Sequence, residues 1–166
     1  MINKLIYYLT KILSKIVKII HKIEDFEESG VYIHGLIKYR LKCNVIPLDG
    51  KYKLVSLDTW RKIIQSDTLN LTKKWHRDVF DCDDFAIVFK AHMSEFYEIN
   101  SVGIALGKIY DAKTNKFISY HAYNLIVAKN GSIELYVYEP QTDELVKAEK
   151  RTKLGNCIYE IDTVII

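Results

Sequence analysis

Several features are scarce in this chain of 166 residues, and each absence excludes a class of function. It has three cysteines, Cys43, Cys82 and Cys157, and no CxxC pair, which excludes a zinc knuckle and a thioredoxin-type motif. An odd number of cysteines without a secretory leader favours free thiols in a reducing compartment, so we expect a cytoplasmic protein. The sequence also shows no internal repeat and no low-complexity segment.

Strong charge and long apolar runs are missing as well. The formal net charge is only +3, and most basic residues are spread along the chain. A nucleic-acid-binding protein usually has a dense basic face, so we expect no nucleic-acid partner. Lysines interrupt the apolar residues near the N-terminus well before they reach the length of a transmembrane helix. The remaining composition, 49% hydrophobic and 27% charged, is typical of a soluble globular domain.

The first segment, residues 2–23, is predicted to be a basic amphipathic helix. Ile and Leu residues recur at a helical three-four spacing, and lysines lie on the other side. We therefore divide the chain into an N-terminal amphipathic helix, residues 1–28, and a main domain, residues 29–166. Three partners for the apolar stripe stay open: the rest of this chain or a second copy of it, another protein, and an anionic membrane surface.

The main domain is predicted to be α+β, because helical patterns come first and strand patterns follow. Residues 24–30 favour a turn, and Ser56 is expected to cap a short helix. Residues 83–98 have the apolar spacing of a buried helix. The dipeptide Asn130-Gly131 favours a tight hairpin in an antiparallel sheet. The predicted strands are residues 102–110, 117–128, 133–139 and 157–166.

Cys82 differs from the other two cysteines because three aspartates surround it at the start of a predicted helix. Asp81 is placed to cap this helix, and Asp83 and Asp84 lie in its first turn. The positive end of the helix dipole lowers the pKa of a thiol, whereas neighbouring carboxylates raise it. These opposing effects mean that a nucleophilic Cys82 needs an activating base.

His121 and Glu139 are the candidates for that base and for its orienting acid. Side chains alternate along a strand, and a hairpin around Asn130-Gly131 would place Glu139 opposite Ala122, one residue from His121. With a small register shift the carboxylate can orient the imidazole. A nucleophile on a helix, a base on a strand and an acid on the next strand make up a generalised catalytic triad.

Three short motifs carry a resemblance to a known family. The strings Asp-Cys-Asp-Asp-Phe-Ala, His-Ala-Tyr-Asn and Glu-Pro-Gln-Thr, within residues 52–145, resemble the papain-like domain of the Marasmius oreades agglutinin and related proteins of phages and microbes. The first string also resembles bacterial transglutaminase-like cysteine proteinases. The resemblance implies a papain-like α+β core, in which a Cys-bearing helix packs on an antiparallel sheet, and a phage or virus origin is compatible with it.

The resemblance also implies roles for individual residues. Cys82 would be the nucleophile, His121 the base and Glu139 the orienting acid. Asp83 and Asp84 would be calcium ligands, since hard oxygen donors suit that ion, although the sequence itself requires no cofactor. The candidates for oxyanion and cleft residues are Trp75, Gln65, Gln141 and Asn124.

The expected function is that of a cysteine peptidase or acyltransferase acting on a protein or peptide substrate. Cys82 would attack a carbonyl carbon, and its backbone N–H with one further donor would bind the oxyanion. Two alternatives stay open. One is a catalytically silent binding module, in which Asp81, Asp83 and Asp84 hold calcium or a partner. The other is a virion-associated or partner-recruited component that docks through residues 2–23.

Overall fold

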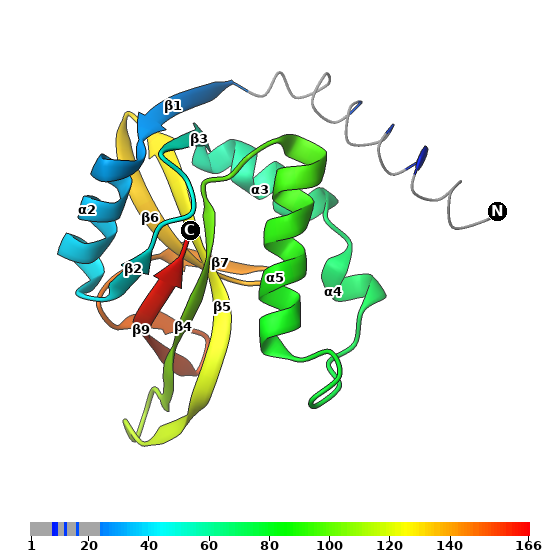
Figure 1. Ribbon diagram of the computed structural model, residues 1–166. Coiled ribbons are helices and arrows are strands. Elements are labelled where there is room, and N and C mark those ends of the chain that lie inside the picture. The colour runs from blue at the N-terminus through cyan, green and yellow to red at the C-terminus, as the bar shows by residue number, and fades with distance from the viewer. Residues whose placement is uncertain (1–7, 10–11, 13–15, 17–23) are drawn as a thin grey trace.

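The computed structural model describes residues 8–9, 12, 16 and 24–166 (Figure 1). The N-terminal helix predicted over residues 2–23 therefore lies almost entirely outside the described residues. Its structure, its partners and the domain division at residue 28 stay predictions. Within the described part of the chain, no helix is both long and apolar enough to cross a membrane.

One curved sheet of nine strands forms the centre of the molecule (Figure 1). The main strand order is β1-β3-β5-β4-β9-β2, and β6 also pairs with β5, β7 with β6 and β8 with β9. Most pairs are antiparallel, but β2–β9 and β3–β5 are parallel. The strands are β1 (Asp25–Ser29), β2 (Asn44–Ile46), β3 (Lys51–Val55), β4 (Val102–Asp111), β5 (Phe117–Asn130), β6 (Ser132–Glu139), β7 (Glu144–Lys147), β8 (Thr152–Leu154) and β9 (Cys157–Ile165).

Helices cover parts of both faces of this sheet (Figure 1). One face carries α2, and its residues join a core with Tyr123 and Leu125 of β5. The other face carries α3 and α5, which share a second core with Ile126 and Ala128. Alternate residues of β5 thus point to opposite faces, as strand geometry requires. The helices are α2 (Gly30–Leu41), α3 (Leu57–Ser66), α4 (Leu69–Thr72) and α5 (Cys82–His92), which continues as the π-helical turn η1 (Met93–Tyr97).

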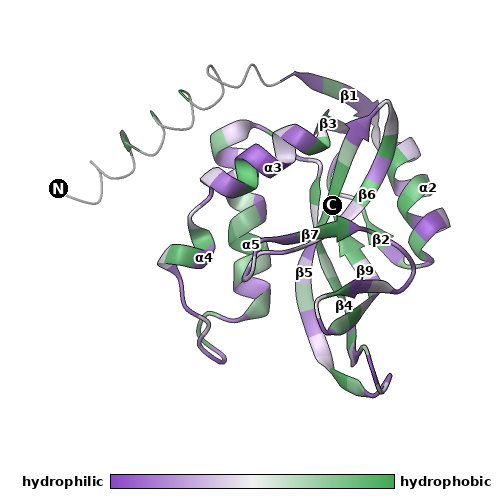
Figure 2. Cartoon of the chain, turned by 180° about the vertical axis from the view of Figure 1, so that it is seen from behind, coloured by the Kyte–Doolittle hydropathy of each residue, from purple (hydrophilic) through white to green (hydrophobic). Residues whose placement is uncertain are grey.

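The expectation of a papain-like α+β core, with helices first and an antiparallel sheet afterwards, is wrong. Strands make up most of the regular structure, and β1, β2 and β3 come from the first third of the chain. The segment predicted to be a turn, residues 24–30, contains β1. Four of its five residues are exposed, and the strand is mostly hydrophilic in Figure 2, so it lacks the apolar alternation that identifies a strand.

The elements that carry the candidate site residues were predicted more accurately. Ser56 caps α3, because its hydroxyl accepts a hydrogen bond from the Thr59 backbone N–H at 3.1 Å. The predicted buried helix is α5 with η1, and the four predicted strands correspond to β4, β5, β6 and β9. The hairpin at Asn130-Gly131 is also confirmed, with Gly131 at a φ of +71°. Its predicted register is wrong by one residue, because Asn124 pairs with Tyr138.

Candidate functional site

Aspartates shape the chain where α5 begins at Cys82. The Asp84 carboxylate accepts a hydrogen bond from the Asp81 backbone N–H at 3.1 Å, as in a capping box. The Asp81 carboxylate accepts one from the Asp78 backbone N–H, also at 3.1 Å. These contacts fix the loop before α5 and place the Cys82 thiol at the first position of the helix, where the helix dipole favours a negative charge.

The Cys82 thiol and the His121 imidazole form a hydrogen-bonded pair. This hydrogen bond lowers the pKa of Cys82 and outweighs partial burial, which acts in the opposite direction. Burial alone lowers the pKa of His121, but its hydrogen bonds to Cys82 and Glu139 dominate and raise that pKa to about 9. A lowered thiol pKa beside a raised imidazole pKa favours a thiolate–imidazolium ion pair near neutral pH.

Glu139 holds the other side of the imidazole. His121 Nε2 lies 2.7 Å from Glu139 Oε2, so Nδ1 is the ring nitrogen left for Cys82. The Glu139 side chain is only 5% exposed, and three further donors bind it. Gln141 donates to Oε1 from its backbone at 3.2 Å and from its side chain at 3.3 Å, and the Tyr159 hydroxyl donates to Oε2 at 3.2 Å. These donors hold the carboxylate in place beside the imidazole.

Strand pairing explains how a thiol on one face of the sheet meets an imidazole on the other. Asn124 faces α5, where its Nδ2 donates to the Ala86 carbonyl at 3.0 Å, so His121 and Tyr123 face the opposite side. The β5–β6 ladder stops at Asn124 and Tyr138. The edge of β5 beside His121 is therefore unpaired with β6. Tyr123 stacks on the His121 ring with centroids 5.9 Å apart.

A pocket opens next to this ion pair. Its lining residues are Cys82, Leu106, Gly107, Tyr120, His121 and Ala122. Apart from the thiol and the imidazole, none of these side chains is ionisable near neutral pH, and Tyr120 at its mouth is 68% exposed. The Cys82 thiol thus lines a mainly apolar groove.

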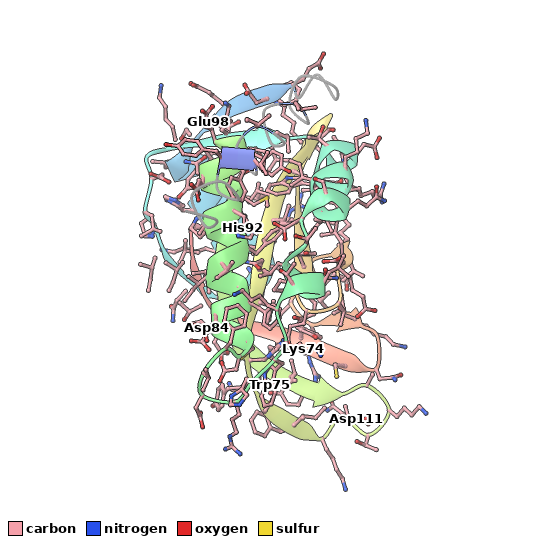
Figure 3. All side chains as sticks on the ribbon, turned by 90° about the vertical axis from the view of Figure 1, so that its right-hand side faces the viewer. Lys74, Trp75, Asp84, His92, Glu98 and Asp111 are labelled. Atoms are coloured by element: carbon pink, nitrogen blue, oxygen red, sulfur yellow. The ribbon has the colours of Figure 1, made fainter. Side chains whose placement is uncertain are left out.

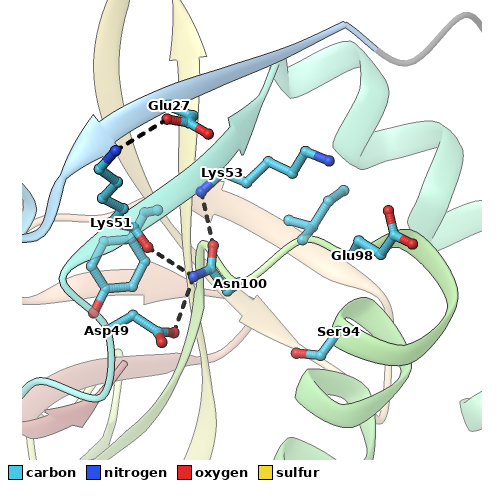
Figure 4. Close-up of a pocket in the computed structure, with 9 residues that line it drawn as sticks. Glu27, Asp49, Lys51, Lys53, Ser94, Glu98 and Asn100 are labelled. Atoms are coloured by element: carbon cyan, nitrogen blue, oxygen red, sulfur yellow. Dashed lines mark hydrogen bonds and ion pairs between the residues drawn. The ribbon is translucent and has the colours of Figure 1, made fainter.

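A second pocket lies elsewhere, between β3, η1 and the residues beside them (Figure 4). Asn100 braces it by donating to the Asp49 carboxylate at 3.0 Å and to the Lys51 carbonyl at 2.9 Å. Asn100 also accepts a hydrogen bond from the Lys53 backbone N–H at 2.8 Å. Its polar groups bind one another and its lining contains no cysteine or histidine, so the groove beside Cys82 is the better candidate site.

The four predicted oxyanion and cleft residues lie in different places. Trp75 is 54% exposed in the loop before α5, and Figure 3 shows it at the same end of the helix as Asp84. The Gln141 side chain binds Glu139, and the Asn124 amide is buried under α5. Gln65 is exposed on α3.

Gln65 is remote from the thiol. The neighbouring Ser66 hydroxyl lies 3.0 Å from the Tyr97 hydroxyl in η1, at the opposite end of the helix from Cys82. Tyr97 follows Cys82 by fifteen residues. At the helical rise per residue, this separation corresponds to roughly 20 Å. The structure thus brings Cys82, His121, Glu139 and Gln141 together and leaves Gln65 outside.

The predicted calcium ligands do not form a calcium site. Asp84 belongs to the helix cap, and the ligand atoms that come within 4.8 Å of one another are those of Asp81, Cys82 and Asp83. A hydrogen bond to Asp81 raises the pKa of Asp83. Calcium takes six to eight oxygen ligands, whereas this cluster offers two carboxylates and a soft thiol. No step of the chemistry below therefore uses calcium.

Sequence reasoning missed Tyr159, which lies on β9, far along the chain from the three motifs. Its hydroxyl binds the same Glu139 oxygen as His121, and its ring packs edge-on against Tyr123 with centroids 4.9 Å apart. Only the β4–β9 pairing brings this residue to the site. No local motif around Tyr159 marks this role.

The fold and the site define a thiol-bearing β-rich domain, and a family match is consistent with this class. Residues 52–145 match the family model described as "Agglutinin C-terminal", which covers more than half of the chain. The chain belongs to this family. No curated protein sequence matches it.

Two solved structures are similar to the chain. One is described as the "PSL1a-E64 complex", and the other as a Polyporus squamosus lectin bound to the epitope Neu5Aca2-6Galb1-4GlcNAc. Both have a TM-score of 0.63 and 23% sequence identity over 84% of this chain. The chain covers 50% and 49% of their lengths, so it spans about half of each. At this identity the similarity establishes the fold alone.

These matches correct the family expected from the motifs. The assignment to papain-like or transglutaminase-like cysteine peptidases is wrong, because the matching model is an agglutinin family and the solved neighbours are lectin chains. The descriptions that came with that assignment, hydrolase and thiol protease, conflict with membership of an agglutinin family. The coarser alternative, a binding module, agrees better with the relatives.

Proposed function

We propose that this agglutinin-family domain is a ligand-binding module whose groove carries a nucleophilic thiolate, and that a bound acyl compound reacts with Cys82. The observation that supports the proposal is the hydrogen-bonded chain from Cys82 through His121 to the buried Glu139, with 2.7 Å between His121 Nε2 and Glu139 Oε2. A buried and fully hydrogen-bonded carboxylate stabilises a positive imidazole, which in turn stabilises a thiolate.

The chemistry follows from the protonation states of this pair. The Cys82 thiolate attacks the acyl carbon and forms a tetrahedral intermediate with a negative oxygen. The Cys82 backbone N–H lies at the first position of α5 and points along the helix start, so it is one donor for this oxygen. The imidazolium of His121 donates its proton to the leaving atom, and the acyl group remains on sulfur as a thioester. An incoming amine can then accept the acyl group.

Alkylation by iodoacetamide across a range of pH tests the proposal, with mass spectrometry used to separate the three cysteines. Cys43 and Cys157 are matched internal controls, since burial raises the pKa of both thiols. We expect Cys82 to react below about pH 7, where an ordinary thiol with a pKa near 8.5 is protonated. His121→Ala should remove this advantage. E64, the compound in one solved neighbour, is a second probe for an adduct on Cys82.

Equal alkylation of all three cysteines at every pH would contradict the proposal. So would an unchanged profile of Cys82 in His121→Ala. A Cys82→Ser variant provides the baseline for both probes, because it keeps the size of the side chain but lacks the thiolate.

Carbohydrate binding is a second candidate function. It is favoured by the agglutinin family match and by the neighbour solved with a glycan epitope. Trp75 and Tyr120 are exposed aromatic side chains, 54% and 68% accessible, of the kind that stack on sugar rings. Calorimetric titration with that trisaccharide tests this function. Binding that survives Cys82→Ser and is lost in Trp75→Ala or Tyr120→Ala would support it, and no heat of binding would refute it for this ligand.

A further inference from the structure

The groove beside Cys82 lies on a part of the sheet that none of the helices in the described part of the chain covers (Figure 1). β4 and β5 extend well past the end of α5 at which Cys82 lies (Figure 1). Leu106 pairs opposite Ala122, and Tyr120 is two residues from Ala122, so these three side chains share the face on which α5 packs. Ala122 is 3% exposed, whereas Leu106 and Tyr120 are 39% and 68% exposed.

These three residues form a shelf next to the thiol. Ala122 is small and leaves space between Leu106 and Tyr120, and all three line the same pocket as Cys82 and His121. The exposed Tyr120 ring and the exposed Leu106 together give this pocket an apolar surface next to the thiol. The position of the shelf, against the reacting atom, indicates that the occupant is part of the reacting compound.

The charges around the shelf argue for an apolar occupant. Besides the His121 imidazolium, which is paired with the Cys82 thiolate and Glu139, the described cation beside the shelf is Lys108, whose Nζ lies 6.0 Å from the centre of the Tyr120 ring. The same Nζ lies 3.4 Å from both carboxylate oxygens of Asp162, which balances its charge. A charged substituent on the shelf would therefore lose hydration without gaining a partner.

We infer that the acyl group transferred to Cys82 carries an apolar substituent that lies on Leu106 and Tyr120, which makes these two residues specificity-determining. The inference rests on the proposed thiolate function and adds the chemical class of the acyl donor. An apolar chain gains from leaving water in proportion to the area that it buries, so longer acyl chains react faster as long as they remain on the shelf.

Acylation by p-nitrophenyl acetate, butyrate and hexanoate tests this inference on the full chain. The Cys82 thiolate attacks the ester carbonyl, the bond to the phenol oxygen breaks, and p-nitrophenolate leaves with the electron pair while the acyl group forms a thioester. Full burial of one methylene corresponds to about fourfold in rate. Since the groove is open, we expect a gain of roughly tenfold in total from acetate to hexanoate.

Variants separate the shelf from the thiol. Leu106→Ser and Tyr120→Ser should lose most of the gain with hexanoate, measured in each variant as the ratio of its hexanoate rate to its acetate rate. Ile118→Ser is the matched control, because Ile118 is 51% exposed on the same strand and does not line the pocket. It should keep the full gain. Tyr120 is at the surface, so its variant remains informative even if Leu106→Ser disturbs the sheet.

The outcomes of the alkylation and acylation experiments separate a failure of the shelf inference from a failure of the proposed thiolate function. If iodoacetamide alkylates Cys82 rapidly but the three esters acylate it at equal rates, the shelf inference is wrong and the thiolate function stands. An equal loss in Ile118→Ser would also overturn the inference. If Cys82 is no more reactive than Cys43, the proposed function is wrong and the inference falls with it.

Discussion

Replacing Glu139 by Gln tests most directly whether the charge of the Glu139 carboxylate raises the pKa of His121. The change keeps the shape of the side chain and removes the negative charge that lies 2.7 Å from His121 Nε2. The His121 side chain is 14% exposed and the Glu139 side chain is 5% exposed, so solvent screens this interaction little. A hydrogen bond to a charged group is worth roughly 1.5–3 kcal/mol. Since 1.36 kcal/mol corresponds to a tenfold change, the pKa of His121 should fall by roughly 1 to 2.

The ion pair loses two protons in succession, and Glu139 affects mainly the second loss, that of the His121 imidazolium proton. In the wild type the imidazolium loses its proton at a pKa of about 9. In Glu139→Gln we expect this value at about 7 to 8. The first proton, from the Cys82 thiol, leaves while His121 is still charged, so its pKa should change much less.

Nuclear magnetic resonance of the histidine ring signals measures the change directly. The chain has five histidines, and a His121→Asn spectrum assigns the signal of interest. Glu144→Gln is a matched control, because Glu144 pairs with Glu139 across β6 and β7 but is exposed and makes no hydrogen bond to His121 among the described residues. A pKa of His121 that is the same in Glu139→Gln and the wild type would refute the reasoning.

Three further predictions concern stability. Gly107→Ala should destabilise the fold by about 2–3 kcal/mol, measured by urea unfolding, because a Cβ there would overlap the Glu160 backbone carbonyl at the β4–β9 bulge. Ser56→Ala should cost about 1 kcal/mol in the same assay through loss of the α3 cap. Contacts with Lys147 and others lower the pKa of Glu134 to about 2. Its contribution is therefore present above its unfolded pKa near 4.5 and lost as pH falls toward 2, so Glu134→Gln should destabilise the protein at neutral pH and much less in strong acid. An equal effect of Glu134→Gln at both pH values, or no effect of either other variant, would contradict these assignments.

The sequence predicted the proximity of Cys82, His121 and Glu139 better than the architecture around them. Cys82, His121 and Glu139 were found because each belongs to a short motif on an element with a clear pattern: an apolar helix for the first and strongly β-forming segments for the other two. The structure brings these three residues into one hydrogen-bonded chain. The register of the hairpin was wrong by one residue, because a turn signal does not specify how many residues the turn excludes from the ladder.

Long-range pairing explains what the sequence did not reveal. β1 and β3 pair with each other and join the sheet through a single β3–β5 pair, and the charged, exposed residues of β1 carry no strand signal. Tyr159 reaches Glu139 only because β9 pairs with β4. The helix α2 does carry a local signal, because Ile33, Ile37 and Leu41 are buried at a spacing of four. Tertiary contacts of this kind are set by the whole fold and not by neighbours in the chain.

Ultraviolet absorbance of the thiolate, followed as a function of pH, is the most direct test of the central claim that Cys82 and His121 form an ion pair. The absorbance of Cys82→Ser is subtracted from that of the wild type, so that Cys43, Cys157 and the tyrosines cancel. The account predicts thiolate absorbance already at about pH 6 and its absence at that pH in His121→Ala. Absorbance that appears only near the ordinary thiol pKa of about 8.5, in both proteins, would contradict it.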